Sequence, residues 1–286
     1  MKVQISCCVH QEDPRVLEAW LEGIAGLNPC QSCDGCSSVK PQIWDEDCPG
    51  LICGECGVSS RSSVELSYKF VLHNPIGYEA EMFERIIPTA KLKVIKTAIP
   101  CTEASDHTHA WHQGVIEIVS KAKNDLIHEA LDSGADYLFF CDSDQVLQPP
   151  TLAHLLEQEK DLIGCISWCK WTPDGPELPN AWMRDHYTMD KDSLETWRKP
   201  GVYKVGFGGG CLLIHRKVLE AGVSYIPIPN LSFKMEDRWF GIRAAVAGFQ
   251  MWISTHYPYL HLYRSGDLDR LEVWRERTKG VEGDDK

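Results

Sequence analysis

The most informative segment of the 286-residue chain runs Gly134-Ala-Asp-Tyr-Leu-Phe-Phe-Cys-Asp-Ser-Asp144. Its central residues, 137–141, are aromatic and apolar, which is typical of a β-strand buried on both faces of a sheet. Two aspartates one residue apart, Asp142 and Asp144, follow this strand directly. In open α/β sheets ligands bind beyond the carboxyl ends of the strands, so the pair lies where a binding site is expected.

On both sides of this segment, predicted strands alternate with predicted helices. The apolar pattern predicts strands at residues 2–9, 65–73, 91–100, 162–168, 205–214 and 251–254, and helices at 14–24, 110–132, 235–248 and from Pro150 onward. The Trp-rich region 168–197 is expected to be a loop. This alternation predicts an α/β fold with a doubly wound, mainly parallel sheet over residues 1–280, although length alone also allows two domains. The acidic residues 281–286 are expected to fray.

Composition and charge limit the class of partner. The chain is 43% hydrophobic and 24% charged, as in ordinary globular proteins. Its 29 Lys and Arg against 41 Asp and Glu give a net charge of −12, which argues against a nucleic-acid or anionic-membrane surface. No stretch approaches the roughly 20 apolar residues of a spanning helix, and the N-terminus is too polar for a signal peptide. We therefore expect a cytoplasmic protein without a membrane span.

The aspartate pair has the chemistry of a divalent-cation site. Carboxylates separated by one residue can approach one Mg²⁺ or Mn²⁺ ion, which prefer oxygen ligands. A cation there could hold a diphosphate and neutralise the charge that develops as the diphosphate leaves. Asp and Ser are also common in turns, so on residues 142–144 alone a solvated turn is the more frequent explanation. The surrounding motifs favour the metal site.

Several motifs, taken in order, resemble those of metal-dependent glycosyltransferases of the GT-A fold, close to the family-2 group. Residues 121–124, Lys-Ala-Lys-Asn, are similar to the basic-Asn segment on the helix before the metal strand, and 134–144 are similar to that strand. Residues 208–219 resemble the acceptor-side strand with its helix, and 236–237 resemble the acidic pair that opens the next helix. The resemblance covers most of the chain outside a Cys-rich insertion. It implies a Rossmann-like, doubly wound mixed sheet.

The resemblance also implies a set of metal ligands. Asp142 and Asp144 would hold the diphosphate of a nucleotide-sugar through Mn²⁺ or Mg²⁺, with Asp144 the more direct ligand. His261 falls where many such enzymes place a third ligand, although His256, five residues earlier, competes for this role. A histidine packed at an apolar strand end, without a metal, is the alternative interpretation of His261.

The acidic pair Glu236-Asp237 is the candidate catalytic centre. By the resemblance, Asp237 would be the general base that takes a proton from an acceptor hydroxyl, with Glu236 in reserve. Acidic residues in the first turn of a helix are also favoured by the helix dipole and by capping, without any catalysis. The residue types alone therefore leave both interpretations open.

Donor and acceptor contacts are expected at the strand ends. Beyond the first strand, the chain departs from the apolar-Pro opening that is usual in the family. A lysine on a long helix is more often solvated surface, and adjacent glycines can simply form a bulge. The donor-binding candidates are His10, Glu12, Asp13, Lys123, Asn124 and Ser143, and the acceptor-binding candidates are Gly209, Gly210 and Trp171.

Six of the thirteen cysteines lie within residues 28–57, which we interpret as an inserted zinc-binding module of zinc-ribbon type. Two pairs of thiolates, each two residues apart, can close a tetrahedral four-sulfur site with a structural role. Two zinc ions shared by all six thiols, an iron–sulfur cluster and disulfides are the alternatives. The candidate ligands are Cys30, Cys33, Cys36, Cys48, Cys53 and Cys56.

Together these observations predict a glycosyltransferase, hexosyltransferase-like, that moves a sugar from a nucleotide-sugar to a hydroxyl acceptor. UDP is the expected nucleotide, and the acceptor could be a glycan, a protein, a small molecule or a modified nucleobase. A DNA-modifying glycosyltransferase acting on hydroxymethylated pyrimidines is an alternative that the acidic charge disfavours. A nucleotidyltransferase lacks support because no glycine-rich basic loop follows the first strand. A zinc-ribbon interaction protein is opposed by the intact acidic residues and His261.

Overall fold

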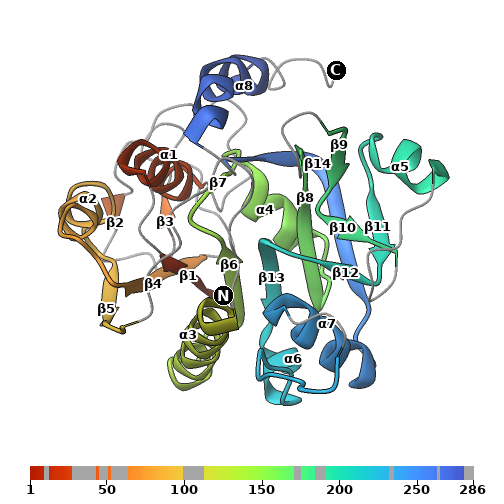
Figure 1. The fold of residues 1–286 in the computed structure, drawn as a ribbon, viewed down its shortest axis with the longest axis horizontal. Helices are drawn as coiled ribbons and strands as arrows, with labels where there is room; N and C mark the ends of the chain where they lie inside the picture. The colour runs from red at the N-terminus through yellow and green to blue at the C-terminus, as the bar shows by residue number, and fades with distance from the viewer. Residues whose placement is uncertain are drawn as a thin grey trace.

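A mixed sheet of ten strands forms the centre of the molecule (Figure 1). The structure, a computed structural model, describes residues 1–9, 13–27, 43–44, 51–52, 64–98, 113–170, 175–183, 191–231, 235–262 and 265–279. Among these, the strands follow the order β11-β14-β8-β13-β6-β1-β4-β5, with β7 paired to β14 and β9 paired to β8. No helix in this described part is long and apolar enough to cross a lipid bilayer.

One half of the sheet is parallel, as the sequence predicted. It consists of β1 (Lys2–Val9), β4 (Glu65–His73), β5 (Lys91–Ile95) and β6 (Tyr137–Cys141). Alternate residues of β6 point to opposite faces, because side chains along a strand alternate in direction. Phe139 packs in the cluster that contains α1 (Pro14–Ala25), whereas Phe140 packs with α3 (Gln113–Asp132). Helices therefore cover both faces of this half.

The other half of the sheet contains antiparallel pairs, so the prediction of a mainly parallel sheet holds for one half only. β13 (Cys211–His215) runs antiparallel to both β6 and β8 (Leu162–Lys170). β14 (Met251–His261) is parallel to β8, and β11 (Val202–Val205) is antiparallel to β14. Segments from distant parts of the sequence are thereby placed beside the end of β6.

The prediction of a single strand at residues 205–214 is wrong. The chain instead forms β11, the short β12 (Phe207–Gly208) and β13, with a turn at Gly209-Gly210 between the last two. Gly210 has φ +91°, a left-handed conformation that glycine adopts without steric cost, and it interrupts the extended backbone. The turn lies next to the end of β6, where the carbonyl of Gly210 accepts a hydrogen bond from the N–H of Asp142.

The remaining elements complete the layers around the sheet. They are β2 (Ile43–Trp44), β3 (Leu51–Ile52), α2 (Tyr78–Ile86), β7 (Gln145–Val146), α4 (Thr151–Glu157), β9 (Glu177–Pro179), β10 (Ala181–Trp182), α5 (Lys191–Trp197), α6 (Arg216–Glu220), α7 (Glu236–Val246), η1 (Ser265–Arg270) and α8 (Leu271–Lys279). Three of them, β9, β10 and α5, lie within 168–197, the region expected to be a loop.

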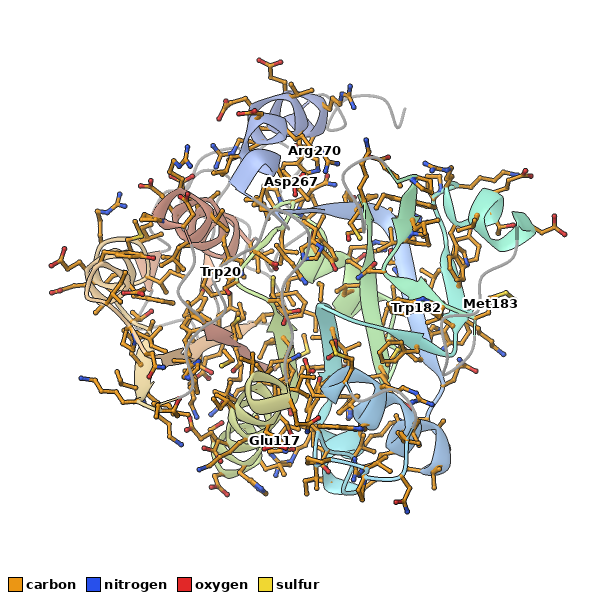
Figure 2. The ribbon with its side chains drawn as sticks, in the orientation of Figure 1. Trp20, Glu117, Trp182, Met183, Asp267 and Arg270 are labelled. Atoms are coloured by element: carbon orange, nitrogen blue, oxygen red, sulfur yellow. The ribbon has the colours of Figure 1, made fainter. Side chains whose placement is uncertain are left out.

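The C-terminal elements pack over the first helix and the loop that carries the aspartates. Leu271 and Trp274 join a cluster with Val16 of α1 and Val146 of β7. Ion pairs reinforce this contact, since Arg275 reaches Glu22 of α1 at 2.7 Å. Asp267 and Arg270, labelled in Figure 2, form a further ion pair within η1 at 3.3 Å. Helices α1 and α8, from early and late in the sequence, therefore pack together beside the loop that carries the aspartates.

Candidate active site

The end of β6 delivers the two aspartates into a tight turn. The backbone carbonyl of Asp142 accepts a hydrogen bond from the N–H of Gln145 at 3.1 Å, which closes the turn. The N–H of Asp142 donates to the carbonyl of Gly210, and the carbonyl of Asp144 accepts from Leu262 at 2.8 Å. The aspartates are thus tied to the glycine turn and to the end of β14.

Asp144 lies against His261. His261 Nε2 is 2.9 Å from Asp144 Oδ2, and the two side chains are 15% and 9% exposed. Burial lowers the pKa of His261, but the neighbouring Asp144 outweighs it and raises that pKa well above its usual value. The competing His256 instead contacts Ser254 and the ring of His154. Of the two candidate histidines, His261 is therefore the one beside the aspartates.

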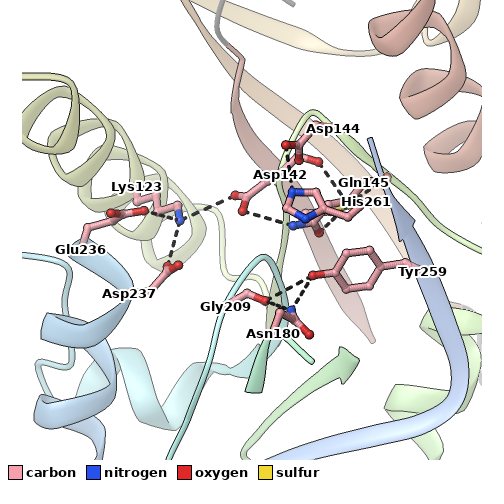
Figure 3. A network of polar contacts seen from close by, with 11 residues as sticks. Lys123, Asp142, Asp144, Gln145, Asn180, Gly209, Glu236, Asp237, Tyr259 and His261 are labelled. Atoms are coloured by element: carbon pink, nitrogen blue, oxygen red, sulfur yellow. Dashed lines mark hydrogen bonds and ion pairs between the residues drawn. The ribbon is translucent and has the colours of Figure 1, made fainter. Parts of the chain in front are cut away.

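Lys123 links Asp142, at the end of β6, to the acidic pair Glu236-Asp237 (Figure 3). Its ammonium lies 3.2 Å from Glu236 Oε1, 3.1 Å from Asp237 Oδ1 and 3.7 Å from Asp142 Oδ1. The side chain is 4% exposed and sits 5.1 Å from the centre of the Tyr225 ring. Burial lowers the pKa of Lys123, but Asp142, Asp237 and Glu236 together raise it well above its usual value. The alternative of a solvated surface lysine is therefore wrong, and a role of Lys123 in donor binding stays a prediction.

The two members of the acidic pair have different environments. The side chain of Glu236 is 3% exposed and that of Asp237 is 20% exposed. Burial raises the pKa of Glu236 to about 7, although Lys123 lowers it, and its Oε2 atom has no hydrogen-bond partner among the residues that the structure describes. Asp237 faces the glycine turn, because a Cβ added to Gly209 would lie 2.7 Å from Asp237 Oδ2. Asp237 is the more accessible carboxylate of the pair.

Asp142 is held between two partners. Lys123 lies on one side, and Gln145 Nε2 donates to Asp142 Oδ2 at 3.2 Å on the other. Burial raises the pKa of Asp142 to about 6, against Lys123, and the nearby Asp237 and Asp144 add to the rise. The side chain of Asp142 is 39% exposed, so a ligand can reach it.

The chemistry of the donor set suits a divalent cation. Two carboxylates and an imidazole are ligands that Mn²⁺ accepts readily, and the Asp144–His261 contact brings two of the three together. Within the described ranges, however, no three His, Cys, Asp or Glu side chains converge as a metal-ready group. The reason is the orientation of Asp142, whose carboxylate contacts Lys123 and Gln145 instead. Asp142 would have to turn toward Asp144 to share one ion.

Several predicted donor-binding residues have structural partners. Asp13 caps α1, because its carboxylate accepts from the N–H of Arg15 at 2.9 Å and also pairs with the Arg15 guanidinium. Asn124 Oδ1 accepts from the N–H of Tyr225 at 2.9 Å and so holds the segment under Lys123. Ser143 is buried between the two aspartates. Outside the described residues lie His10, Glu12, Trp171 and the six cysteines from Cys30 to Cys56.

Sequence reasoning missed three side chains at the site. Asn180 and Tyr259 meet at the carbonyl of Gly209, and Gln145 orients Asp142. Gln145 could have been suspected because it directly follows Asp144. No local sequence signal identifies Asn180 or Tyr259, since they reach the site only through the pairing of β8, β9 and β14.

A second polar group, also missed, lies at the carboxyl ends of β4 and β5. His73 Nε2 is 3.0 Å from Thr97 Oγ1, and Asn74 Oδ1 accepts from the N–H of Thr97 at 2.8 Å. Burial lowers the pKa of His73, which favours the neutral imidazole. These ends neighbour the end of β1, on the side of the sheet edge where the nucleoside is expected.

Comparison with known proteins agrees with this fold. No protein-family model matches the chain. Staphylococcus aureus TarS 1–349 in complex with UDP superposes over 99% of this chain with a TM-score of 0.52 and 12% identity. The complex of the same protein with UDP-GlcNAc superposes over 91% with a TM-score of 0.50 and 11% identity. At this identity the likeness concerns the fold, which is similar to that of GT-A glycosyltransferases.

A curated relative points to the same class of enzyme. An alignment over 176 residues, which covers 54% of this chain, gives 26% identity to the procollagen lysyl hydroxylase and glycosyltransferase of Acanthamoeba polyphaga mimivirus. The chain spans 18% of that protein and 65% of the TarS chain bound to UDP. The fold and the curated relative point to glycosyltransferases, which are transferases.

Proposed function

We propose that this protein is a metal-dependent glycosyltransferase that moves a sugar from a nucleotide-sugar to an acceptor hydroxyl. The observation that carries the proposal is the juxtaposition, through Lys123, of the strand-end aspartates with the acidic pair of α7. The diphosphate of the donor needs a cation, and the attacking hydroxyl needs a base. Asp142, which would help to hold the cation, and Asp237, which would be the base, both lie against the Gly209-Gly210 turn.

Asp142, Asp144 and His261 would hold Mn²⁺ or Mg²⁺. When bound, the cation supplies charge neutralisation for the diphosphate leaving group. The chain's own part is to present two carboxylates from the end of one strand and an imidazole from the end of another. His261 would hold the cation as a neutral imidazole, so it would have to lose its proton to act as a ligand.

Asp237 would act as the general base. The acceptor oxygen attacks the anomeric carbon, a new glycosidic bond forms, and the bond from that carbon to the diphosphate oxygen breaks. The proton of the acceptor hydroxyl passes to Asp237, and the bonding electrons leave with the nucleoside diphosphate. Glu236 is too buried to reach an acceptor, and we assign to it the task of holding Lys123 in place.

Two comparisons support particular substrates. TarS, which shares the fold, binds UDP and UDP-GlcNAc, which favours a UDP-sugar as the donor here. The name of the mimivirus relative combines lysyl hydroxylation with glycosyl transfer, which favours a protein hydroxyl as the acceptor. His73, Asn74 and Thr97 are candidates for contact with the nucleoside, since they lie at the adjoining strand ends.

A structural zinc site within residues 28–57 is part of this proposal. Its support is the spacing of Cys30, Cys33, Cys36, Cys48, Cys53 and Cys56, which suits tetrahedral thiolate coordination. We expect one or two zinc ions per chain, lost on joint replacement of Cys53 and Cys56 by Ser and retained in Asp144→Ala. Elemental analysis without bound zinc would contradict the assignment.

Ligand-dependent thermal stability tests the main proposal. A ligand that binds only the folded protein raises its Tm, so UDP with Mn²⁺ should raise Tm by several degrees, and UDP without a cation by much less. Asp144→Ala should abolish the Mn²⁺-dependent part and reduce transfer by about 1000-fold. Glu272→Ala, at a side chain that is 78% exposed, is the control and should behave as the wild type. Full Mn²⁺-dependent stabilisation of Asp144→Ala would contradict the metal assignment.

A further inference from the structure

Asn180 connects three segments that surround the candidate active site. The residue follows β9 and is 7% exposed. Its Oδ1 accepts a hydrogen bond from the N–H of Ser167 on β8 at 2.7 Å. Its Nδ2 donates to the carbonyl of Gly209 and to the hydroxyl of Tyr259, both at 2.6 Å (Figure 3). Because the Ser167 N–H is a donor, only this orientation of the amide satisfies all three bonds.

The Gly209-Gly210 turn held by this amide contacts both Asp237, the proposed base, and Asp142, a proposed metal ligand. On one side, a Cβ on Gly209 would lie 2.7 Å from Asp237 Oδ2. On the other side, the carbonyl of Gly210 accepts from the N–H of Asp142 at 3.3 Å, and a Cβ on Gly210 would overlap the Gln145 amide. Bare backbone therefore lies against both carboxylate sites. Its position, together with Lys123, which contacts both Asp237 and Asp142, determines their separation.

We propose that Asn180 is a positioning residue that fixes the separation of Asp237 and Asp142 through the carbonyl of Gly209. This inference rests on the proposed function and adds a residue that touches neither substrate. Tyr259 approaches the same carbonyl only at 3.4 Å, so the Asn180 amide makes the shorter bond to it. Reaction rates depend steeply on alignment, and a displacement of about 1 Å can reduce the rate by about 100-fold.

Replacement of the amide by a carboxylate tests the inference. Asn180→Asp keeps the shape of the side chain but places an acceptor oxygen against the carbonyl of Gly209. Because the two oxygens repel, the Gly209-Gly210 turn must move. We expect kcat for transfer to fall by about 100-fold, while KM for the nucleotide-sugar changes by less than about threefold. Tyr259→Phe keeps the Asn180–Gly209 bond and should change kcat by less than about threefold. Equal losses of kcat in the two variants would overturn the inference.

Gln4→Ala is the matched control for a purely structural role. Gln4 is also a buried amide, and its Nε2 donates two hydrogen bonds at 3.1 Å, to Ser6 and to the carbonyl of Leu126. We expect this variant to lower Tm and to leave kcat per folded molecule unchanged. If Asn180→Asp loses no more kcat per folded molecule than Gln4→Ala, Asn180 supports the fold and does not position the base.

Failure of the proposed function would be seen separately. Wild-type protein that transfers no sugar from any nucleotide-sugar with Mn²⁺ would refute the function, and the positioning claim would then be decided by crystal structures alone. The claim predicts that Asn180→Asp shifts the Gly209-Gly210 turn and changes the separation of the Asp237 and Asp142 carboxylates. An unchanged separation would overturn it, whatever the activity.

Discussion

Asp144 and the acidic pair Glu236-Asp237 have different cationic partners, and Asp142 lies 3.7 Å from the second of these, Lys123. Asp144 lies against the imidazole of His261 at 2.9 Å, whereas Glu236 and Asp237 lie against the ammonium of Lys123 at 3.2 and 3.1 Å. An imidazole can lose its proton and then bind a metal, but a lysine whose pKa is raised keeps its charge and has no lone pair. Asp144 is therefore suited to exchange its imidazole partner for a metal ion.

The pair Glu236-Asp237 keeps Lys123 as its partner, and this difference suits the two groups of carboxylates to different proposed roles. The ammonium of Lys123 contacts Asp237 and, because it has no lone pair, does not compete with the carboxylates for a metal. Glu236 is more deeply buried and shares the same ammonium, so it anchors Lys123 and leaves Asp237 facing the glycine turn. In the proposed function, the same kind of side chain would bind a cation on one side and accept a proton on the other.

The largest effect on this contrast is expected from Asp237→Asn. An amide has nearly the same shape but accepts a proton poorly, so transfer should fall by about 1000-fold. Binding of UDP with Mn²⁺, measured by calorimetry, should stay within about threefold of wild type because the metal side is unchanged. A variant that still transfers sugar at the wild-type rate would remove Asp237 from the role of base.

Loss of Lys123 should affect stability more than any change on the metal side. Lys123→Met leaves the buried carboxylate of Glu236 without a counter-charge, and breaking a buried ion pair typically costs about 3–5 kcal/mol. We expect a reduction of this size in the free energy of unfolding, measured with urea. The double variant Lys123→Met with Glu236→Gln should recover part of it. Wild-type stability of Lys123→Met would show that the cluster is solvated.

On the metal side, His261→Ala and His256→Ala separate the two histidines. Removal of a ligand should weaken Mn²⁺ binding by about 10- to 100-fold in His261→Ala, because the ion keeps only its carboxylate ligands. His256 contacts Ser254 and His154, so His256→Ala should bind Mn²⁺ as the wild type does. Titration of Mn²⁺ in the presence of UDP, followed by its electron paramagnetic resonance signal, measures both. Equal affinities would exclude His261 as a ligand.

The smallest expected effect is a change in the pH dependence of stability. Burial raises the pKa of Glu236 from 4.5 to about 7, so between these pH values the folded protein binds more protons at this group than the unfolded chain does. This group therefore makes the free energy of unfolding decrease as pH rises through that range. Glu236→Gln removes this contribution, and its stability relative to wild type should increase from pH 5 to pH 7. A difference that is independent of pH would contradict the raised pKa.

The parallel half of the fold was predictable because its signals are local. The strand at 2–9, the strand at 65–73 and the strand before Asp142 were all confirmed, since a buried strand between helices has a continuous apolar pattern. The antiparallel half depends on pairing between distant segments, such as β13 with β6. The glycines at 209–210 allow either a continuous strand or a bulge, and the residue types alone do not decide between them, because the break depends on how this segment packs beside β6.

The site was predictable to the extent that its residues adjoin recognisable motifs. Asp142, Asp144, Asp237 and His261 were named from the sequence, and the structure brings them to one edge of the sheet. What sequence could not show is which histidine reaches the aspartates, or that Lys123 is buried among the acids. Both depend on how β14 and α3 pack against β6, which no short motif encodes.

The most direct test of the central claim is a crystal structure of the wild-type protein with Mn²⁺ and UDP. We predict an anomalous manganese peak within coordinating distance of Asp144 Oδ2 and His261 Nε2, with both phosphates of UDP on the same ion. Asp142 should have turned away from Lys123, and Asp237 should keep its contact with the ammonium. Manganese bound elsewhere, or UDP bound with Asp144 and His261 still paired to each other, would contradict the account.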